Sequence, residues 1–306
     1  MTVQNEPRVE ELRAAADRAR DAYNTQTAIS LYSQAIDLVG AADRDTLVDL
    51  LMCRVVCHTR LSNVDEARSD LESLRNLAEE TGDARQLDRL LLPRAAIDCW
   101  FGLASAVRAD VEPALDRARR AGDTSLEADL SLALALAWRR LAENDHARET
   151  GLRALDLYQT LGNQRGEAES AYHAGVAAYE LGQADDGRRL IGHAREIAGR
   201  IGYREIEAQV LSTSSLNEGD LAVTRAMIER AEATLEVIGS RIELSRAHNN
   251  LALIYRGLGL DQRASEYAER AVATSRSMNL RSLLPYALET LGQAYLGLGR
   301  LDDARD

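Results

Sequence analysis

Small and apolar residues return along the chain with a period of about 40 residues, arranged as two helical stretches in each period. One column of positions repeats at spacings of 39, 40, 40, 40, 37, 40 and 40 residues, through Ala28, Ala67, Val107, Ala147, Gly187, Thr224, Ala264 and Ala304. Twelve residues earlier lies a second small column: Ala16, Val55, Ala95, Ala135, Gly175, Ser212, Ala252 and Gly292. Small residues at these two places allow two antiparallel helices to approach closely, because larger side chains would separate their backbones. The pattern predicts a helical hairpin in each period.

Two further columns mark the turns. Five residues before the first column lie Tyr23, Ser62, Gly102, Ala142, Gly182, Gly219, Gly259 and Gly299, between the two helices of each hairpin. Fifteen residues after it lie Gly82, Gly122, Gly162, Gly202, Gly239 and Asn279, between one hairpin and the next. Glycine and asparagine tolerate the left-handed backbone that ends many helices. Each unit is therefore predicted to contain a helix, a tight turn, a second helix and a second tight turn.

The columns predict a single solenoid over residues 1–306, with a truncated last unit. Its units span about 8–43, 44–83, 84–123, 124–163, 164–202, 203–239, 240–279 and 280–306. Because the last unit is incomplete, we expect a longer protein that continues after residue 306, with Leu291, Tyr295 and Leu298 partly uncovered. The sixth unit is three residues short between Gly202 and Ser212, so its first helix should lose about one turn. Pro93 and Pro113 should each kink or delay a helix.

The four columns together resemble tetratricopeptide repeats. The clearest copies are the segment 251–255 (LALIY) with Gly259, Ala264 and Ala271, and the segment 291–295 (LGQAY) with Gly299 and Ala304. The period is longer than the 34 residues usual for the family, and is similar to that of repeats in bacterial signal-transduction proteins and kinesin light chain. The resemblance implies an all-α, right-handed α-α superhelix of about eight helical hairpins that binds a protein or peptide.

Composition narrows the classes of partner. The formal net charge is −12, from 37 basic and 49 acidic residues, which argues against nucleic acid or an anionic membrane as a partner. All 37 basic residues are arginine, which excludes chemistry that depends on lysine. The charged N-terminus has no apolar signal segment, and no apolar run is long enough for a bilayer span. We therefore expect a cytoplasmic protein.

No catalytic or cofactor motif stands out. Cys53, Cys57 and His58 have the spacing of two thiols on one helix face, but a metal site needs further ligands. Cys57 and His58 also fall in packing columns, so they are interpreted as core residues, with metal binding as the alternative. The three cysteines do not form a disulfide framework. We expect no enzyme activity, no metal and no cofactor.

The resemblance implies that the first helix of each hairpin lines a concave binding groove. Its exposed columns contain Arg89, Arg139, Arg140, Tyr172, His173, Tyr179, Gln209, Asn217, Arg246, Asn249, Asn250, Arg256, Glu289 and Gln293. In relatives an asparagine near Asn249 binds the backbone of an extended peptide. The alternative is that Asn249 and Asn250 are solvated or bond within the solenoid. Five arginines against one acidic residue in these columns favour an acidic peptide or protein tail.

The expected function is that of a protein- or peptide-binding scaffold, the sensory or regulatory region of a larger bacterial signalling protein. One alternative is a regulatory region of a nucleotide cyclase or a DNA-binding transcription regulator that senses a small ligand. Another is a self-association module that forms homo-oligomers through the uncovered C-terminal repeat.

Overall fold

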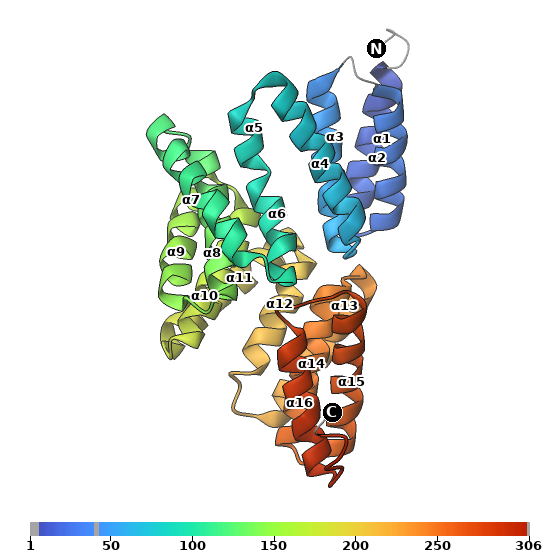
Figure 1. Cartoon of the computed structure of the whole chain (residues 1–306), viewed down its shortest axis with the longest axis vertical. Coiled ribbons are helices and arrows are strands. Elements are labelled where there is room, and N and C mark those ends of the chain that lie inside the picture. The colour runs from blue at the N-terminus through green and yellow to red at the C-terminus, as the bar shows by residue number, and fades with distance from the viewer. Residues whose placement is uncertain (1–5, 40–42, 305–306) are drawn as a thin grey trace. The chain divides into compact units, whose positions relative to one another are not determined.

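The chain is a succession of helices joined by short turns (Figure 1). The structure, a computed structural model, describes residues 6–39 and 43–304. No strand occurs within these ranges, and successive helices pack in pairs, so the prediction of an all-α helical-repeat fold is confirmed. Among the described residues no helix has the length and apolar character needed to cross a bilayer.

The helices form two compact units, Met1–Ile97 and Asp98–Asp306. Unit 1 contains α1 (Glu6–Asp21), α2 (Thr25–Val39), α3 (Arg44–Arg60), α4 (Val64–Thr81), α5 (Ala84–Arg89) and most of α6 (Leu91–Asp98). Unit 2 contains η2 (Cys99–Phe101), α7 (Ala104–Ala121), α8 (Thr124–Arg140), α9 (Asn144–Leu161), α10 (Gln164–Glu180), α11 (Ala184–Ile201), α12 (Arg204–Ser215), α13 (Leu221–Ile238), α14 (Arg241–Gly257), α15 (Asp261–Ser277) and α16 (Leu284–Gly297). The single solenoid with eight unit boundaries stays a prediction.

The turn columns adopt the left-handed backbone expected of them. All six positions between hairpins have positive φ, from +54° at Asn279 to +81° at Gly239. Within hairpins, Tyr23, Ser62 and Ala142 adopt positive φ although each carries a Cβ. Gly219 is the exception, because α12 ends early at Ser215 and leaves Gly219 in a longer loop. Position in the repeat therefore decides the turn conformation more than residue type does.

The irregular units follow the expectations in part. Helix α12 has 12 residues where its neighbours α10 and α14 have 17, which confirms the loss of about one turn. The chain breaks at Leu90 between α5 and α6, next to Pro93. Pro113, in contrast, lies inside an uninterrupted α7, so the expected delay is wrong there. Pro113 and Ala109, four residues earlier, are both exposed, and on an exposed helix face water can replace the hydrogen bond that a proline removes.

The small columns form the helix crossings. Ala28, Ala67, Ala147 and Ala264 are fully buried. A Cβ built on Gly175 of α10 would lie 2.9 Å from Ile191 Cγ1 of α11. The core of each hairpin therefore depends on small side chains in these columns.

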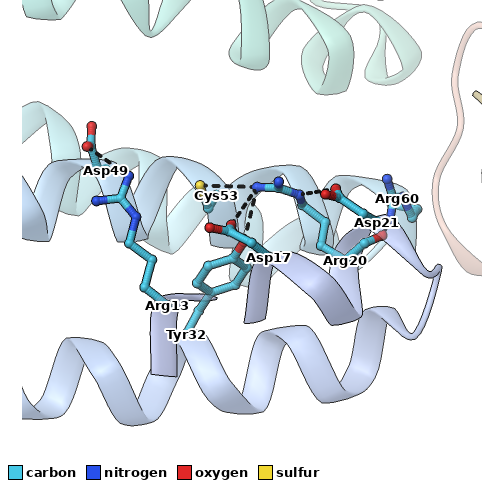
Figure 2. A network of polar contacts seen from close by, with 8 residues as sticks. All are labelled: Arg13, Asp17, Arg20, Asp21, Tyr32, Asp49, Cys53 and Arg60. Atoms are coloured by element: carbon cyan, nitrogen blue, oxygen red, sulfur yellow. Dashed lines mark hydrogen bonds and ion pairs between the residues drawn. The ribbon is translucent and has the colours of Figure 1, made fainter. Parts of the chain in front are cut away.

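Unit 1 contains an ion-pair network between its first three helices (Figure 2). Arg20 of α1 pairs with Asp17 at 3.0 Å and Asp21 at 3.1 Å, and donates to the Tyr32 hydroxyl of α2 at 3.1 Å. Its Nη1 also lies 3.5 Å from the Cys53 Sγ of α3. Because every acidic group of the network has an arginine partner, we interpret the network as a brace between these helices.

The thiols of α3 pack into the interior of unit 1. Cys57 is fully buried and His58 is 8% exposed, which agrees with their interpretation as core residues. Burial raises the pKa of Cys57 to about 11, so this thiol is protonated at neutral pH. In the described part of the chain, no three His, Cys, Asp or Glu side chains are grouped as a metal site.

Candidate functional site

The predicted groove residues lie on the first helix of each hairpin. Arg89 is on α5 in unit 1, and the other thirteen belong to unit 2. They are distributed over α8 (Arg139, Arg140), α10 (Tyr172, His173, Tyr179), α12 and its end (Gln209, Asn217), α14 (Arg246, Asn249, Asn250, Arg256) and α16 (Glu289, Gln293). In unit 2, α10 packs against α8 and α12, and α14 against α12 and α16, so these helices form one inner layer.

Three of these residues are buried, whereas the sequence predicted exposed positions. Tyr172 is 2% exposed, and Asn249 and Asn250 are each 6% exposed. Asn250 donates from Nδ2 to Ser212 Oγ of α12 at 2.8 Å, and so bonds within the solenoid. The reason for the burial is that neighbouring inner helices pack directly against each other and cover these positions. Their role in binding stays a prediction.

The first and last parts of unit 2 are in contact. Ser282, in the loop before α16, donates from its backbone N at 3.3 Å and from its Oγ at 2.9 Å to the Trp100 carbonyl of η2. These two residues are separated by 182 positions in the chain. The first element of unit 2 therefore contacts the last hairpin, and α8 and α14, about 100 residues apart, come within electrostatic range.

Three arginines of the inner layer consequently act together on His173, and we call Arg139, Arg140 and Arg246 the arginine cluster. Arg139 donates from Nη1 to His173 Nδ1 at 2.7 Å. The Arg140 guanidinium lies 3.6 Å from the centre of the Trp100 ring. Arg246 donates from Nε to Glu243 Oε2 at 2.8 Å. Two other predicted residues contact the cluster: His173, and Tyr172, whose ring centre lies 5.9 Å from the Arg139 guanidinium carbon.

Burial and mutual repulsion act on the charged form of the cluster. Burial first, and then the charge of Arg139, lowers the pKa of Arg140 to about 9, against an opposing effect of Glu243. Arg140 is still a cation at neutral pH, in a place that disfavours its charge. For Arg246, burial lowers the pKa and Glu243 raises it, with a net increase.

His173 is neutral in this surrounding. Burial, followed by the charges of Arg139, Arg140 and Arg246, lowers the pKa of its imidazole well below the usual value. Because a guanidinium only donates, His173 accepts at Nδ1 and carries its proton on Nε2. The arginine cluster therefore contacts an uncharged acceptor here, not an acid.

The neutral His173 predicts a pH dependence of stability. Folded His173 binds its proton less readily than unfolded His173, so stability rises with pH and is lost as the pH falls below about 6.5. The largest slope from one such group is about 1.4 kcal/mol per pH unit. Urea unfolding of unit 2, followed by tryptophan fluorescence between pH 7.5 and 5.5, should show a shallower slope for His173→Gln than for the wild type. Equal slopes would contradict a neutral His173.

The sequence did not reveal several residues that shape this site. Trp100, Glu243 and Ser282 contact the cluster or close the unit, and none of them was a candidate. Trp100 and Glu243 lie outside the exposed columns of the repeat, so an assignment of groove residues by column does not select them. The one available signal was the rarity of tryptophan, present twice in the chain, at Trp100 and Trp138.

Comparisons with known proteins agree with the helical-repeat architecture. A family model described as tetratricopeptide repeat matches residues 245–277. A comparison with curated protein sequences finds no match.

Solved structures with a similar fold include a Rap protein complexed with Competence and Sporulation Factor, at 13% identity and a TM-score of 0.64, covering 98% of this chain and 95% of that one. The apo quorum sensor NprR from B. thuringiensis is 12% identical with a TM-score of 0.51, over 98% and 96% of the two chains. A signal transduction ATPase with a tetratricopeptide repeat sensor from Pyrococcus horikoshii is 15% identical with a TM-score of 0.53, over 90% of this chain and 45% of that one. At these identities the likeness shows the fold alone.

The fold is thus that of a helical-repeat scaffold, and in unit 2 most of the predicted groove residues lie on its inner helices. Residues 245–277 match the tetratricopeptide-repeat model, and the successive helical pairs of the chain have the architecture of such repeats.

Proposed function

We propose that the protein is a peptide- or protein-binding scaffold that acts as the sensory or regulatory region of a signalling protein. The fold supports this proposal, since structures with the same architecture include a Rap protein bound to Competence and Sporulation Factor and the quorum sensor NprR. The binding surface we propose is the inner layer of unit 2, and the ligand is an extended acidic segment.

The observation that carries the proposal is the polar character of this inner layer. On α14, Arg246 and Asn249 are one turn apart and therefore lie on the same face. Asn249 Oδ1 is buried and has no hydrogen-bond partner in the part of the chain that the structure describes. An unpaired buried amide costs about 1–3 kcal/mol, and a peptide backbone supplies both the donor and the acceptor that an amide can use.

Selection from a displayed library of random peptides tests the proposal with the whole chain as bait. We expect selected peptides rich in Asp and Glu that bind with micromolar affinity, about −8 kcal/mol. Calorimetry should show at least about tenfold weaker binding to the double variant Arg246→Ala/Asn249→Ala, because a charged and an amide contact are removed together. Arg230→Ala, which removes an exposed arginine from the outer helix α13, is the matched control and should bind like the wild type.

Two results would overturn the proposal. One is a selection that yields no binding peptide. The other is wild-type affinity in the double variant, which would place the binding surface elsewhere.

Self-association through α16 is a second candidate function. Tyr286 is 63% exposed and Leu296 is 56% exposed on this helix. Large apolar side chains on a surface mark contact sites when they gather in a patch. Sedimentation velocity should then show a dimer for the wild type and a monomer for Tyr286→Ser/Leu296→Ser. A wild type that is monomeric at high concentration would remove this candidate.

A further inference from the structure

The arginine cluster carries more positive charge than its surroundings neutralise. Glu243 pairs with Arg246, with Nη2 as well as Nε lying 2.8 Å from Oε2. Both partners of this pair are largely buried, with side-chain exposures of 17% and 15%. Glu243 is also the carboxylate that acts most strongly on Arg140. Glu243 therefore pairs with one of the three guanidiniums, Arg246, and acts at longer range on a second, Arg140.

The other two guanidiniums have uncharged partners. In residues 6–39 and 43–304, the contacts of Arg139 are His173 Nδ1 and the Tyr172 ring, 5.9 Å from the guanidinium carbon. The contact of Arg140 there is the Trp100 ring. A ring face attracts a cation but leaves the N–H groups at the edge of the guanidinium free to donate. These donors are what an oxyanion needs.

Such an arrangement is costly for a fold and useful for a ligand. Burying a charge without an opposite charge is unfavourable, and a protein that needs only stability does better with apolar residues at such positions. Arginine presents five donors in a planar fork that matches the oxygens of a carboxylate or phosphate. The guanidiniums of Arg139 and Arg140, which have no carboxylate partner on the inner layer of unit 2 as described, thus have the chemistry of a preformed anion site.

We propose that Arg139, Arg140 and Arg246 form an internal subsite that binds one oxyanion group, a carboxylate or a phosphate, of a ligand held on the inner layer of unit 2. The inference rests on the proposed function, because the subsite would hold one acidic group of the bound segment. Arg139 and Arg140 at the end of α8 bind the oxygens, and Arg246 adds its charge from α14. Occupation of the subsite ties α8 to α14 and so stabilises unit 2.

The overall charge limits the ligand to one that is small or locally acidic. The chain carries −12 in total, so a long polyanion meets repulsion away from the subsite. With one carboxylate against three guanidiniums, the subsite has two positive charges to offer. That suits a single carboxylate or phosphate group.

Trp100 provides a direct readout of binding. Its ring lies against Arg140, and Trp138 is the only other tryptophan of the chain. In a Trp138→Phe background, titration with inorganic phosphate or with succinate should change the Trp100 fluorescence saturably, while sodium chloride at the same ionic strength should not. Saturation with either anion supports the subsite. The anion with the lower dissociation constant shows whether the subsite prefers a phosphate or a carboxylate group.

Variants separate binding from structure. Arg140→Gln, in the same Trp138→Phe background, should weaken the anion response at least about tenfold, because it removes a charge-assisted contact. Arg230→Gln, which replaces an exposed arginine of the outer helix α13, is the matched control and should respond like its background. Without anion, the melting temperature of Arg140→Gln should equal or exceed that of its background, since the variant removes a half-buried charge whose contact is an uncharged ring. A cluster with a purely structural role would instead lower that melting temperature.

The anion affinity of Arg140→Lys tests the role of the guanidinium shape without a loss of charge. Lysine keeps the cation but not the fork, so an intermediate affinity is expected. The inference is overturned if phosphate and succinate act no differently from chloride, or if Arg140→Gln binds them as its background does. Full binding by a selected acidic peptide in the Arg140→Gln variant would leave the proposed function standing and remove the subsite. If phosphate or succinate binds but the selection yields no peptide, the subsite stands and the proposed function is removed.

Discussion

Asp70→Ala is expected to lower the free energy of unfolding of unit 1 by about 3 kcal/mol, because it strands a buried guanidinium. Asp70 of α4 is 5% exposed and accepts two hydrogen bonds from Arg54 of α3, at 2.6 and 2.8 Å. Breaking one side of a buried ion pair costs more than the pair contributes, since the remaining charge has no partner. Urea unfolding followed by far-ultraviolet circular dichroism measures the change.

Glu72→Ala on the same helix is the matched control. Glu72 pairs with Arg75 at 2.9 Å, but both side chains are more than half exposed, so the loss should stay below about 1 kcal/mol. Replacing both buried partners, as Arg54→Met/Asp70→Leu, should recover most of the stability. Equal losses for Asp70→Ala and Glu72→Ala would show that the Arg54 pair does not hold α3 against α4.

Gly175→Leu is expected to destabilise unit 2 by roughly 1–3 kcal/mol through overpacking. A Cβ at Gly175 would meet not only Ile191 Cγ1 at 2.9 Å but also the Ile191 backbone N at 3.1 Å, and backbone cannot move aside as a flexible side chain can. Urea unfolding followed by tryptophan fluorescence reports on unit 2, which contains both tryptophans.

Gly192→Leu on the facing helix α11 is the control for this change. Gly192 is exposed, and nothing lies within 4 Å of a Cβ built there. Leucine at this position should be neutral or stabilise by about 0.5 kcal/mol, because glycine is a poor helix former. If the two leucine variants melted alike, the assignment of Gly175 to a close crossing would be wrong.

Much of the local structure was predictable because each repeat specifies it again. The small columns, the turn positions and the shortened α12 follow from residues at most about 20 positions apart in the chain. Helix packing within one hairpin and the left-handed turns between hairpins are short-range properties. Even Tyr23, Ser62 and Ala142 adopt the turn conformation that their place in the repeat predicts.

The candidate site was less predictable, because exposure in a repeat depends on its neighbours. Asn249 and Asn250 sit in columns that the family leaves open to ligand, yet both are buried here. The packing of α14 against the short α12 brings Asn250 to Ser212, a partner 38 residues away. A column assignment contains no information about such a contact, since it treats every unit as equivalent.

The helical hairpins, their small-residue crossings and their turns follow from the sequence alone, because they depend on interactions inside one unit or between two adjacent units. The contact of Ser282 with Trp100, and the approach of Arg140 to Glu243 and Arg246, are instead properties of the folded unit 2. These contacts depend on the rotation that every hairpin adds to the last, accumulated over unit 2. A small change in any one hairpin, such as the turn missing from α12, alters the accumulated rotation. Residues about 100 positions apart are therefore brought together by all the hairpins of unit 2 and not by a single repeat.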